Sequence, residues 1–189
     1  MKRYFFLIVL FWSFCVCNSQ TNLAYEELIA EASLLHLKKD YKNAISKLEK
    51  AFSLEEPDAL NSYKAAGMYA LAENKTEAFK YLNRTLNKGW TEAEQLSIDP
   101  YFDFLRANYS ESWKAIEQKA QLKEQQYEKK LKLPELRKQI NAMGIADQKL
   151  RYSKIQTSDP AQLKELHQKI NDLDFKNLST AKEILRNYG

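Results

Sequence analysis

Two similar stretches decide the fold: Asp40-Tyr41-Lys42-Asn43-Ala44, which leads to Phe52, and Asn74-Lys75-Thr76-Glu77-Ala78, which leads to Leu86. Ala44 and Ala78 lie 34 positions apart. In each stretch a polar turn residue precedes apolar residues at helical spacing. The doubling therefore predicts the second helix of a helix-turn-helix unit in both places.

Composition points to the same class of structure. The 189 residues include only four Gly and four Pro, too few for the closely spaced turns of a sandwich or barrel. Good helix formers (Leu, Ala, Glu, Lys and Gln) dominate after the first twenty positions. We expect an all-α fold of antiparallel helical hairpins followed by a C-terminal helical segment.

The first nineteen residues predict a signal peptide. Lys2 and Arg3 form a positive start, and an apolar run from Tyr4 to Val16 is short for a membrane span. Small residues Cys17 and Ser19 lie at −3 and −1 if cleavage precedes Gln20. We expect a bacterial protein that is periplasmic or secreted and touches the membrane only through this segment. An uncleaved N-terminal anchor is the alternative.

Removal of this segment changes the chemistry of the chain. Both cysteines, Cys15 and Cys17, lie within it, so the mature chain would hold no thiol or disulfide. Loss of Lys2 and Arg3 leaves 27 basic against 25 acidic residues, a net charge of +2. The basic run Lys129-Lys130-x-Lys132 follows several glutamates and is best explained as a solvated helix face. We expect no nucleic-acid partner.

Residues 20–109 resemble tetratricopeptide repeats. Repeats of this family carry small residues at their eighth and twentieth positions, which here hold Ala32 and Ala44, then Ala66 and Ala78. Small side chains at these positions let neighbouring helices approach closely. Leu28 and Ser62 stand where the family usually has Trp. The resemblance implies a short solenoid of helical hairpins that binds a protein or peptide.

Two repeats normally bury too little surface to stand alone, so we expect a cap. Gly89-Trp90 ends the second unit, and Asp99-Pro100 begins a new segment. Apolar residues then follow closely as a predicted plug: Tyr101, Phe102, Phe104 and Leu105. A substrate-binding aromatic box is the other interpretation, but aromatic residues at helical spacing are usually core.

The rest of the chain predicts further helices. A charged connecting helix spans residues 110–132, and Leu133-Pro134 begins a C-terminal helical domain over 133–189. We expect a helix from Pro134 to about Gln156 and another from Pro160. We place a break at Asp174–Asn177, and Thr180 with Glu183 then suggests a capping box for a last helix.

This C-terminal part resembles an uncharacterised bacterial helical family, domain of unknown function six-six-two-four. The matching residues are Leu136, Met143, the run Asp147-Gln148-x-x-Arg151, Asp174-x-x-Asn177, and Ile184-Leu185-x-x-Tyr188-Gly189. Members of the family continue into Trp-Pro and a helix with a Gln-His motif. The resemblance therefore implies an incomplete domain here, and it implies no function.

The sequence contains few residues in arrangements that could support catalysis. His36 and His167 are the only histidines and lie in no metal-ligand spacing. We expect no catalytic residue, metal or cofactor. One polar constellation stands out, made of Asp147, Gln148, Arg151, Asp174 and Asn177. It predicts either a polar site for an anion or, as we favour, an interhelix hydrogen-bond network.

Two functions follow. The first is a non-catalytic binding or scaffold module, whose first helices line a groove for a peptide or partner protein. Six residues are expected to line it: Glu26, Ile29, Ser33, His36, Tyr63 and Gly67. The alternative is an enzyme or ligand sensor centred on Asp147 and Arg151. Residue content favours the binding module.

Overall fold

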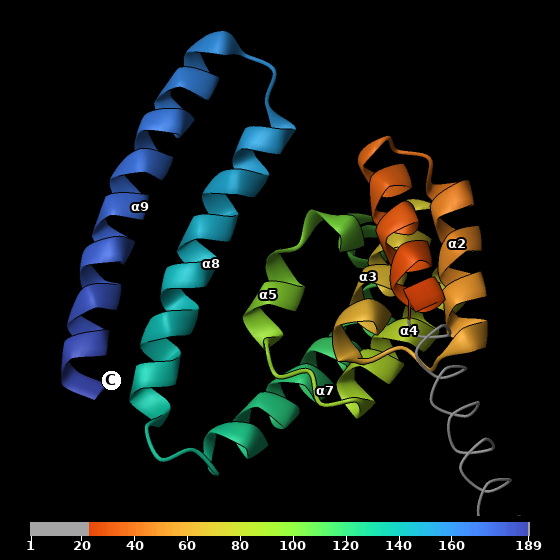
Figure 1. The fold of residues 1–189 in the computed structure, drawn as a ribbon, viewed down its shortest axis with the longest axis horizontal. Coiled ribbons are helices and arrows are strands. Elements are labelled where there is room, and N and C mark those ends of the chain that lie inside the picture. Colours follow the sequence, from red (N-terminus) through yellow and green to blue (C-terminus); the bar gives the residue numbers. More distant parts are fainter. Residues whose placement is uncertain (1–22, 189) are drawn as a thin grey trace, which may run out of the picture. The chain divides into compact units, whose positions relative to one another are not determined.

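The computed structural model describes residues 23–188, and the described part of the chain is helical without a strand (Figure 1). The predicted signal peptide, with Cys15 and Cys17, lies outside it. Between residues 23 and 188, no helix has both the length and the apolar character needed to cross a membrane. The elements are α1 (23–37), α2 (Tyr41–Leu54), α3 (Ala59–Leu71), α4 (Lys75–Asn87), α5 (Ala93–Ile98), the 3-10 helix η1 (Pro100–Phe102), α6 (Asp103–Asn108), α7 (Ser110–Glu128), α8 (Pro134–Gln156) and α9 (Pro160–Tyr188).

The contacts divide these elements into two compact units. The first unit holds α1 to α4, α6 and the start of α7, with η1 from Tyr101 onward. The second holds the segment Thr91–Pro100 and the chain from Glu117 onward. Residues 91–100 thus pack with the C-terminal part, through contacts between α5 and α8, although the sequence predicts them as part of the repeat region.

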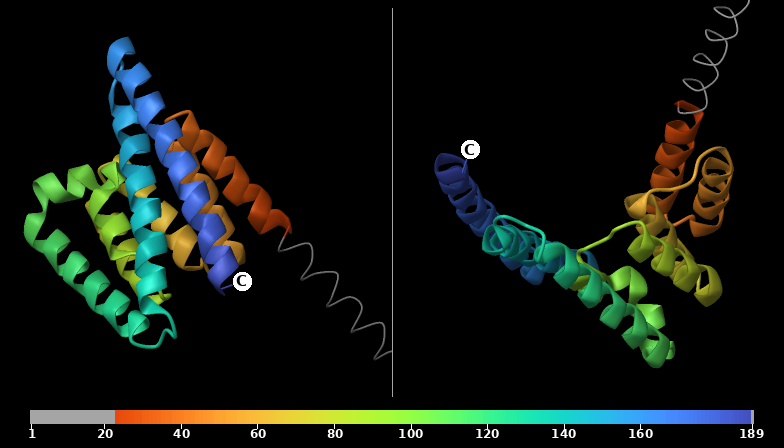
Figure 2. Two further views of the ribbon diagram at one scale, coloured as in Figure 1. Left: turned by 90° about the vertical axis from the view of Figure 1, so that its left-hand side faces the viewer. Right: turned by 90° about the horizontal axis from the view of Figure 1, so that it is seen from below.

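Antiparallel helix pairs build both units, which confirms the predicted all-α class. The pairs are α1 with α2, α3 with α4, and α8 with α9. Figures 1 and 2 show α8 and α9 side by side along most of their length.

The turns within the first two pairs are alike. Lys39 and Glu73 both adopt a positive φ, of 60° and 58°, two positions after the last residue of the first helix of each pair. The next residue, Asp40 or Asn74, caps the second helix by accepting a hydrogen bond from a backbone N–H three positions on. Both turns thus follow one geometry at the same 34-residue spacing as the alanines.

Backbone hydrogen bonds define that geometry as a Schellman motif. The Asp40 N–H donates to the Leu35 carbonyl at 3.0 Å, and the Asn74 N–H donates to the Tyr69 carbonyl at 2.9 Å. The helix α4 ends in the same way at Gly89, whose φ is 98°. The predicted role of Gly89 as a helix-ending residue is confirmed.

Alanines fill the points where these helices meet. Ala32, Ala44, Ala66 and Ala78 are all 0% exposed. A side chain of one carbon lets the backbones approach, and larger residues such as Leu48 and Leu82 fill the space beside them.

An aromatic plug closes this unit. Phe102 is 0% exposed and lies with its ring centroid 5.4 Å from that of Tyr63 and 5.4 Å from that of Trp113. Leu105 is also fully buried, while Phe104 is half-buried and Tyr101 is 36% exposed. The predicted packed cap is therefore formed chiefly by Phe102 and Leu105.

The predicted break at Asp174–Asn177 is wrong, because α9 runs without interruption from Pro160 to Tyr188. The side chains that α9 turns away from solvent recur at alternating spacings of three and four: Leu163, Leu166, Ile170, Leu173, Asn177, Thr180 and Ile184. This seam continues through the supposed break, which holds neither Gly nor Pro. Packing against α8 therefore overrides the weak helix propensity of Asp and Asn there.

The close approach of the first helices is testable with two substitutions on α1. Ala32→Leu adds volume at a fully buried contact and should lower the free energy of unfolding by ~1–3 kcal/mol. Ala30→Leu, at an exposed position of the same helix, is the control and should change it by less than ~0.5 kcal/mol. Urea unfolding followed by tryptophan fluorescence is suitable, because Trp90 and Trp113 both lie in this unit. Equal effects of the two substitutions would contradict the packing.

Candidate functional site

The structure gives the predicted groove residues of the first unit very different surroundings. Glu26 is exposed on α1, whereas Ile29 is buried. Ser33 is half-buried, and its hydroxyl donates a hydrogen bond to the Ile29 carbonyl at 2.9 Å. Tyr63 is buried, with its ring stacked on Trp90 at a centroid distance of 4.4 Å. Part of the predicted groove is thus covered by the chain itself.

The remaining two groove residues meet Tyr101. The Tyr101 hydroxyl lies 2.8 Å from Nε2 of His36, a hydrogen-bond distance. Its ring lies against Gly67, where an added Cβ would come within 3.1 Å of the ring carbon Cδ2. The ring of Tyr41 lies beyond His36, with a centroid distance of 5.7 Å. We call His36, Tyr41 and Gly67 the Tyr101 seat.

The predicted polar constellation lies on the α8–α9 hairpin. Nε of Arg151 donates to both carboxylate oxygens of Asp147 at 2.8 Å, and its Nη2 lies 3.3 Å from Asp174 on α9. Gln148 donates to Asp147 at 3.4 Å, while Asn177 lies further along the seam of α9. The hydrogen bond that Arg151 donates to the Asp147 carboxylate raises the pKa of Arg151, which therefore stays charged. The arrangement bridges the two helices at an exposed edge.

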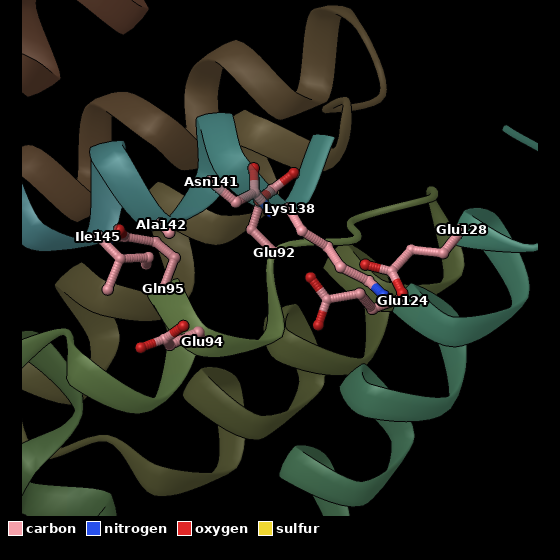
Figure 3. Close-up of a pocket in the computed structure, with 9 residues that line it drawn as sticks. All are labelled: Glu92, Glu94, Gln95, Glu124, Glu128, Lys138, Asn141, Ala142 and Ile145. Carbon is pink, nitrogen blue, oxygen red and sulfur yellow. The ribbon is translucent and has the colours of Figure 1, made fainter. Parts of the chain in front are cut away.

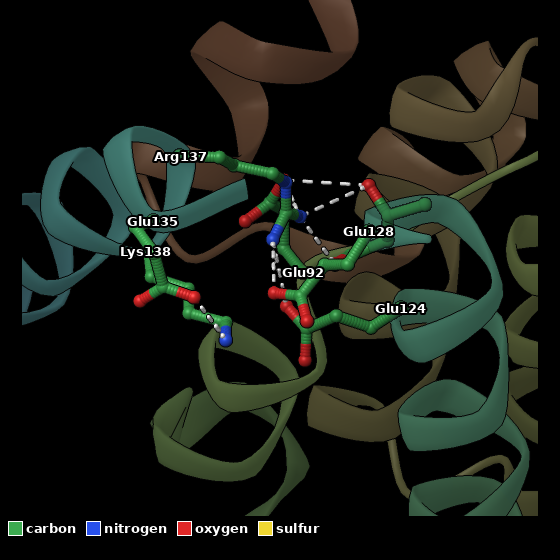
Figure 4. A network of polar contacts seen from close by, with 7 residues as sticks. Glu92, Glu124, Glu128, Glu135, Arg137 and Lys138 are labelled. Atoms are coloured by element: carbon green, nitrogen blue, oxygen red, sulfur yellow. Dashed lines mark hydrogen bonds and ion pairs between the residues drawn. The ribbon is translucent and has the colours of Figure 1, made fainter. Parts of the chain in front are cut away.

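The structure contains a second polar cluster that was not predicted from the sequence. It surrounds Arg137 on α8, whose side chain is only 13% exposed (Figure 4). Nη2 of Arg137 lies 3.0 Å from the Glu92 carboxylate, and Nη1 lies 3.3 Å from both Glu124 and Glu128 on α7. Nη2 also donates to the Thr91 carbonyl at 2.8 Å. We call these five residues the Arg137 cluster.

The Arg137 cluster draws on three separate segments of the second unit, which explains why the sequence concealed it. Glu92 precedes α5, the two other glutamates lie one turn apart on α7, and Arg137 lies in the first turns of α8. The spacing of Glu124 and Glu128 was visible, but it is also typical of a solvated helix face. Only the fold brings Glu92 beside them.

Charge in the cluster is unbalanced, with three carboxylates around one guanidinium. Burial raises the pKa of Glu124 above its ordinary value, and the nearby charges of Glu128 and Glu92 raise it further. The hydrogen bond and positive charge of Arg137 oppose this shift without cancelling it.

A pocket of about 230 Å³ adjoins the cluster within the second unit (Figure 3). Seven of its nine lining residues are of polar type, four of them glutamates, and α8 adds the apolar Ala142 and Ile145. The lining residues are Glu92, Glu94, Gln95, Glu124, Glu128, Lys138, Asn141, Ala142 and Ile145. Among residues 23–188, no group of three or more His, Cys, Asp or Glu side chains could hold a metal ion. The pocket therefore carries four glutamates without forming a group of metal ligands.

No protein-family model, curated protein or solved structure matches this chain. The resemblances to tetratricopeptide repeats and to the uncharacterised bacterial family therefore stay predictions. The residues that the structure describes form an all-helical fold built from paired helices.

The shifted pKa of Glu124 predicts a pH-dependent stability of the second unit. The pKa of Glu124 is raised in the folded state. As the pH rises through this pKa, ionisation of Glu124 therefore lowers the free energy of unfolding. The wild type should therefore gain stability relative to Glu124→Gln as the pH falls from about 7 to about 4.

Urea unfolding followed by circular dichroism at each pH measures this difference. Glu135→Gln removes the same charge at an exposed position of α8 and controls for net charge. The raised pKa of Glu124 would be contradicted if the difference in free energy of unfolding between the wild type and Glu124→Gln were the same at every pH. It would also be contradicted if the variant gained stability relative to the wild type at low pH.

Proposed function

We propose that this protein is an exported, non-catalytic binding module that holds a peptide or partner protein on the first helices of a tetratricopeptide-like unit. The observation that carries the proposal is the position of Tyr101. A side chain from another segment of the chain lies on Gly67 and is hydrogen-bonded to His36, both of which belong to the predicted groove. This face of the helices therefore has the shape and polarity to accept a passing segment.

The repeated turns support the tetratricopeptide-like interpretation. The positive φ at Lys39 and Glu73, the helix caps at Asp40 and Asn74, and the buried alanines all follow a single 34-residue spacing. Helical repeats of this kind present their first helices on one face, where binding partners lie. The predicted signal peptide supports export to the periplasm or the outside of the cell.

Exposure narrows the part of the groove that can meet a partner. Glu26 is exposed, and Ser33 lies two turns further along the same face of α1. Ile29 and Tyr63 are buried and would contribute shape rather than direct contact. A partner segment would therefore run along Glu26 and Ser33 toward the Tyr101 seat.

The alternative, an enzyme or ligand sensor at Asp147 and Arg151, has weaker support. The guanidinium of Arg151 already donates to Asp147 and contacts Asp174, so its charge is used within the hairpin. Arg151 and Asp174 are exposed. A bridge between the two helices therefore explains why Asp147, Arg151 and Asp174 lie together.

A matched pair of charge reversals on α1 tests the proposal. Linear peptides are selected from a phage-displayed random library on the wild-type protein, and their affinities are measured by fluorescence anisotropy. Glu26→Lys should weaken the selected peptides at least roughly ten-fold if a positive group lies beside this carboxylate. Glu27→Lys makes the same change about 100° around the helix and should leave the affinity unchanged.

Two outcomes would overturn the binding module. The library could yield no peptide that binds the folded protein, or both charge reversals could affect binding equally. Circular dichroism of each variant confirms that the helices remain intact.

A further inference from the structure

The Tyr101 seat carries information about the partner, since its present occupant reveals which side chain fits. We infer that Tyr101 is a built-in occupant of the binding face, and that the partner presents a tyrosine side chain that displaces it. The inference rests on the proposed function and names the chemistry that the face recognises.

The seat matches both parts of a tyrosine side chain. Nε2 of His36 lies 2.8 Å from the phenol oxygen, so the ring hydroxyl has a defined hydrogen-bond partner. The His36 ring meets the Tyr101 ring edge to face, with centroids 4.9 Å apart and an interplanar angle of 68°. Gly67 supplies a floor without a side chain, and any Cβ there would crowd the ring.

The contact with Tyr101, rather than the backbone, favours glycine at position 67. Gly67 lies within α3, where an alanine would be the better helix former by about 1 kcal/mol. An alanine Cβ would meet the Tyr101 ring at 3.1 Å, so the ring would have to shift by a few tenths of an ångström to make room for it. The residue thus gives up helix stability at the place where an aromatic ring lies.

Tyr101 is more exposed than its neighbour in the cap. Its neighbour Phe102 is 0% exposed and anchors η1 in the aromatic plug, whereas Tyr101 is 36% exposed. A partner that displaces the Tyr101 side chain would break the His36 hydrogen bond and the Gly67 contact. Loss of one hydrogen bond and one partly buried ring contact should lower the apparent affinity of a ligand that displaces Tyr101 by roughly ten-fold.

The inference is tested by removing the occupant and offering its side chain as a free molecule. The probe is p-cresol, which has the ring, hydroxyl and first carbon of a tyrosine side chain. It is titrated into the ¹⁵N-labelled protein while the Gly67 amide and the His36 resonances are followed by NMR. Tyr101→Ala should show saturable shifts at both residues, at concentrations about ten-fold lower than the wild type requires.

Three controls make the result specific. Toluene lacks the hydroxyl and should bind Tyr101→Ala several-fold more weakly than p-cresol. Phe104→Ala removes a half-buried aromatic residue of the same cap and should leave the p-cresol response of the wild type unchanged. Tyr101→Phe preserves the ring packing if Tyr101→Ala fails to fold, and its affinity for p-cresol should exceed that of the wild type.

The outcomes separate this inference from the proposed function. Folded Tyr101 variants that show no saturable shift at Gly67 and His36, or that titrate like the wild type, would overturn the tyrosine seat. Selected peptides that bind without an aromatic residue would also overturn it while leaving the binding module intact. Binding of p-cresol together with selected peptides that compete with it through a tyrosine would support it.

Discussion

The packing of the Phe102 ring between Tyr63 and Trp113 is the interaction on which the first unit depends. Two helical hairpins bury too little apolar surface to be stable by themselves, so the exposed side of the second hairpin needs a cover. Phe102 supplies it from a short 3-10 helix, and its full burial places the neighbouring Tyr101 within reach of His36. The cap and the occupied groove are therefore consequences of one buried ring.

The second unit is held together in a different way. Among the residues of the α8–α9 hairpin, only Ile145 and Ile170 are buried, and large apolar side chains such as Phe175 remain exposed. Polar contacts connect its segments instead, chiefly those of Arg137 with three carboxylates and that of Arg151 with Asp174. Elements with few buried apolar contacts open at low free energy, so we expect this hairpin to exchange its amide hydrogens faster than α3.

The sequence predicted most of the first unit and little of the polar chemistry. Local signals were sufficient where one segment decides the outcome, as with the alanines of the hairpins and Gly89 at the end of α4. They failed where distant segments meet. The seam of α9 overrode a polar stretch at Asp174–Asn177, and the Arg137 cluster needed Glu92 from another segment. The contact of Tyr101 with His36 could not be foreseen either, since 65 residues separate them.

The most direct measurement compares the free energies of unfolding of Phe102→Ala and Phe104→Ala, followed by tryptophan fluorescence in urea. Phe102 is fully buried and Phe104 only half-buried in the same cap. Phe102→Ala should lose ~3–5 kcal/mol, and Phe104→Ala clearly less. Phe102→Ala should also release the Tyr101 ring from His36. Similar small losses in both variants, with the His36 resonances unchanged, would contradict a first unit that depends on this ring.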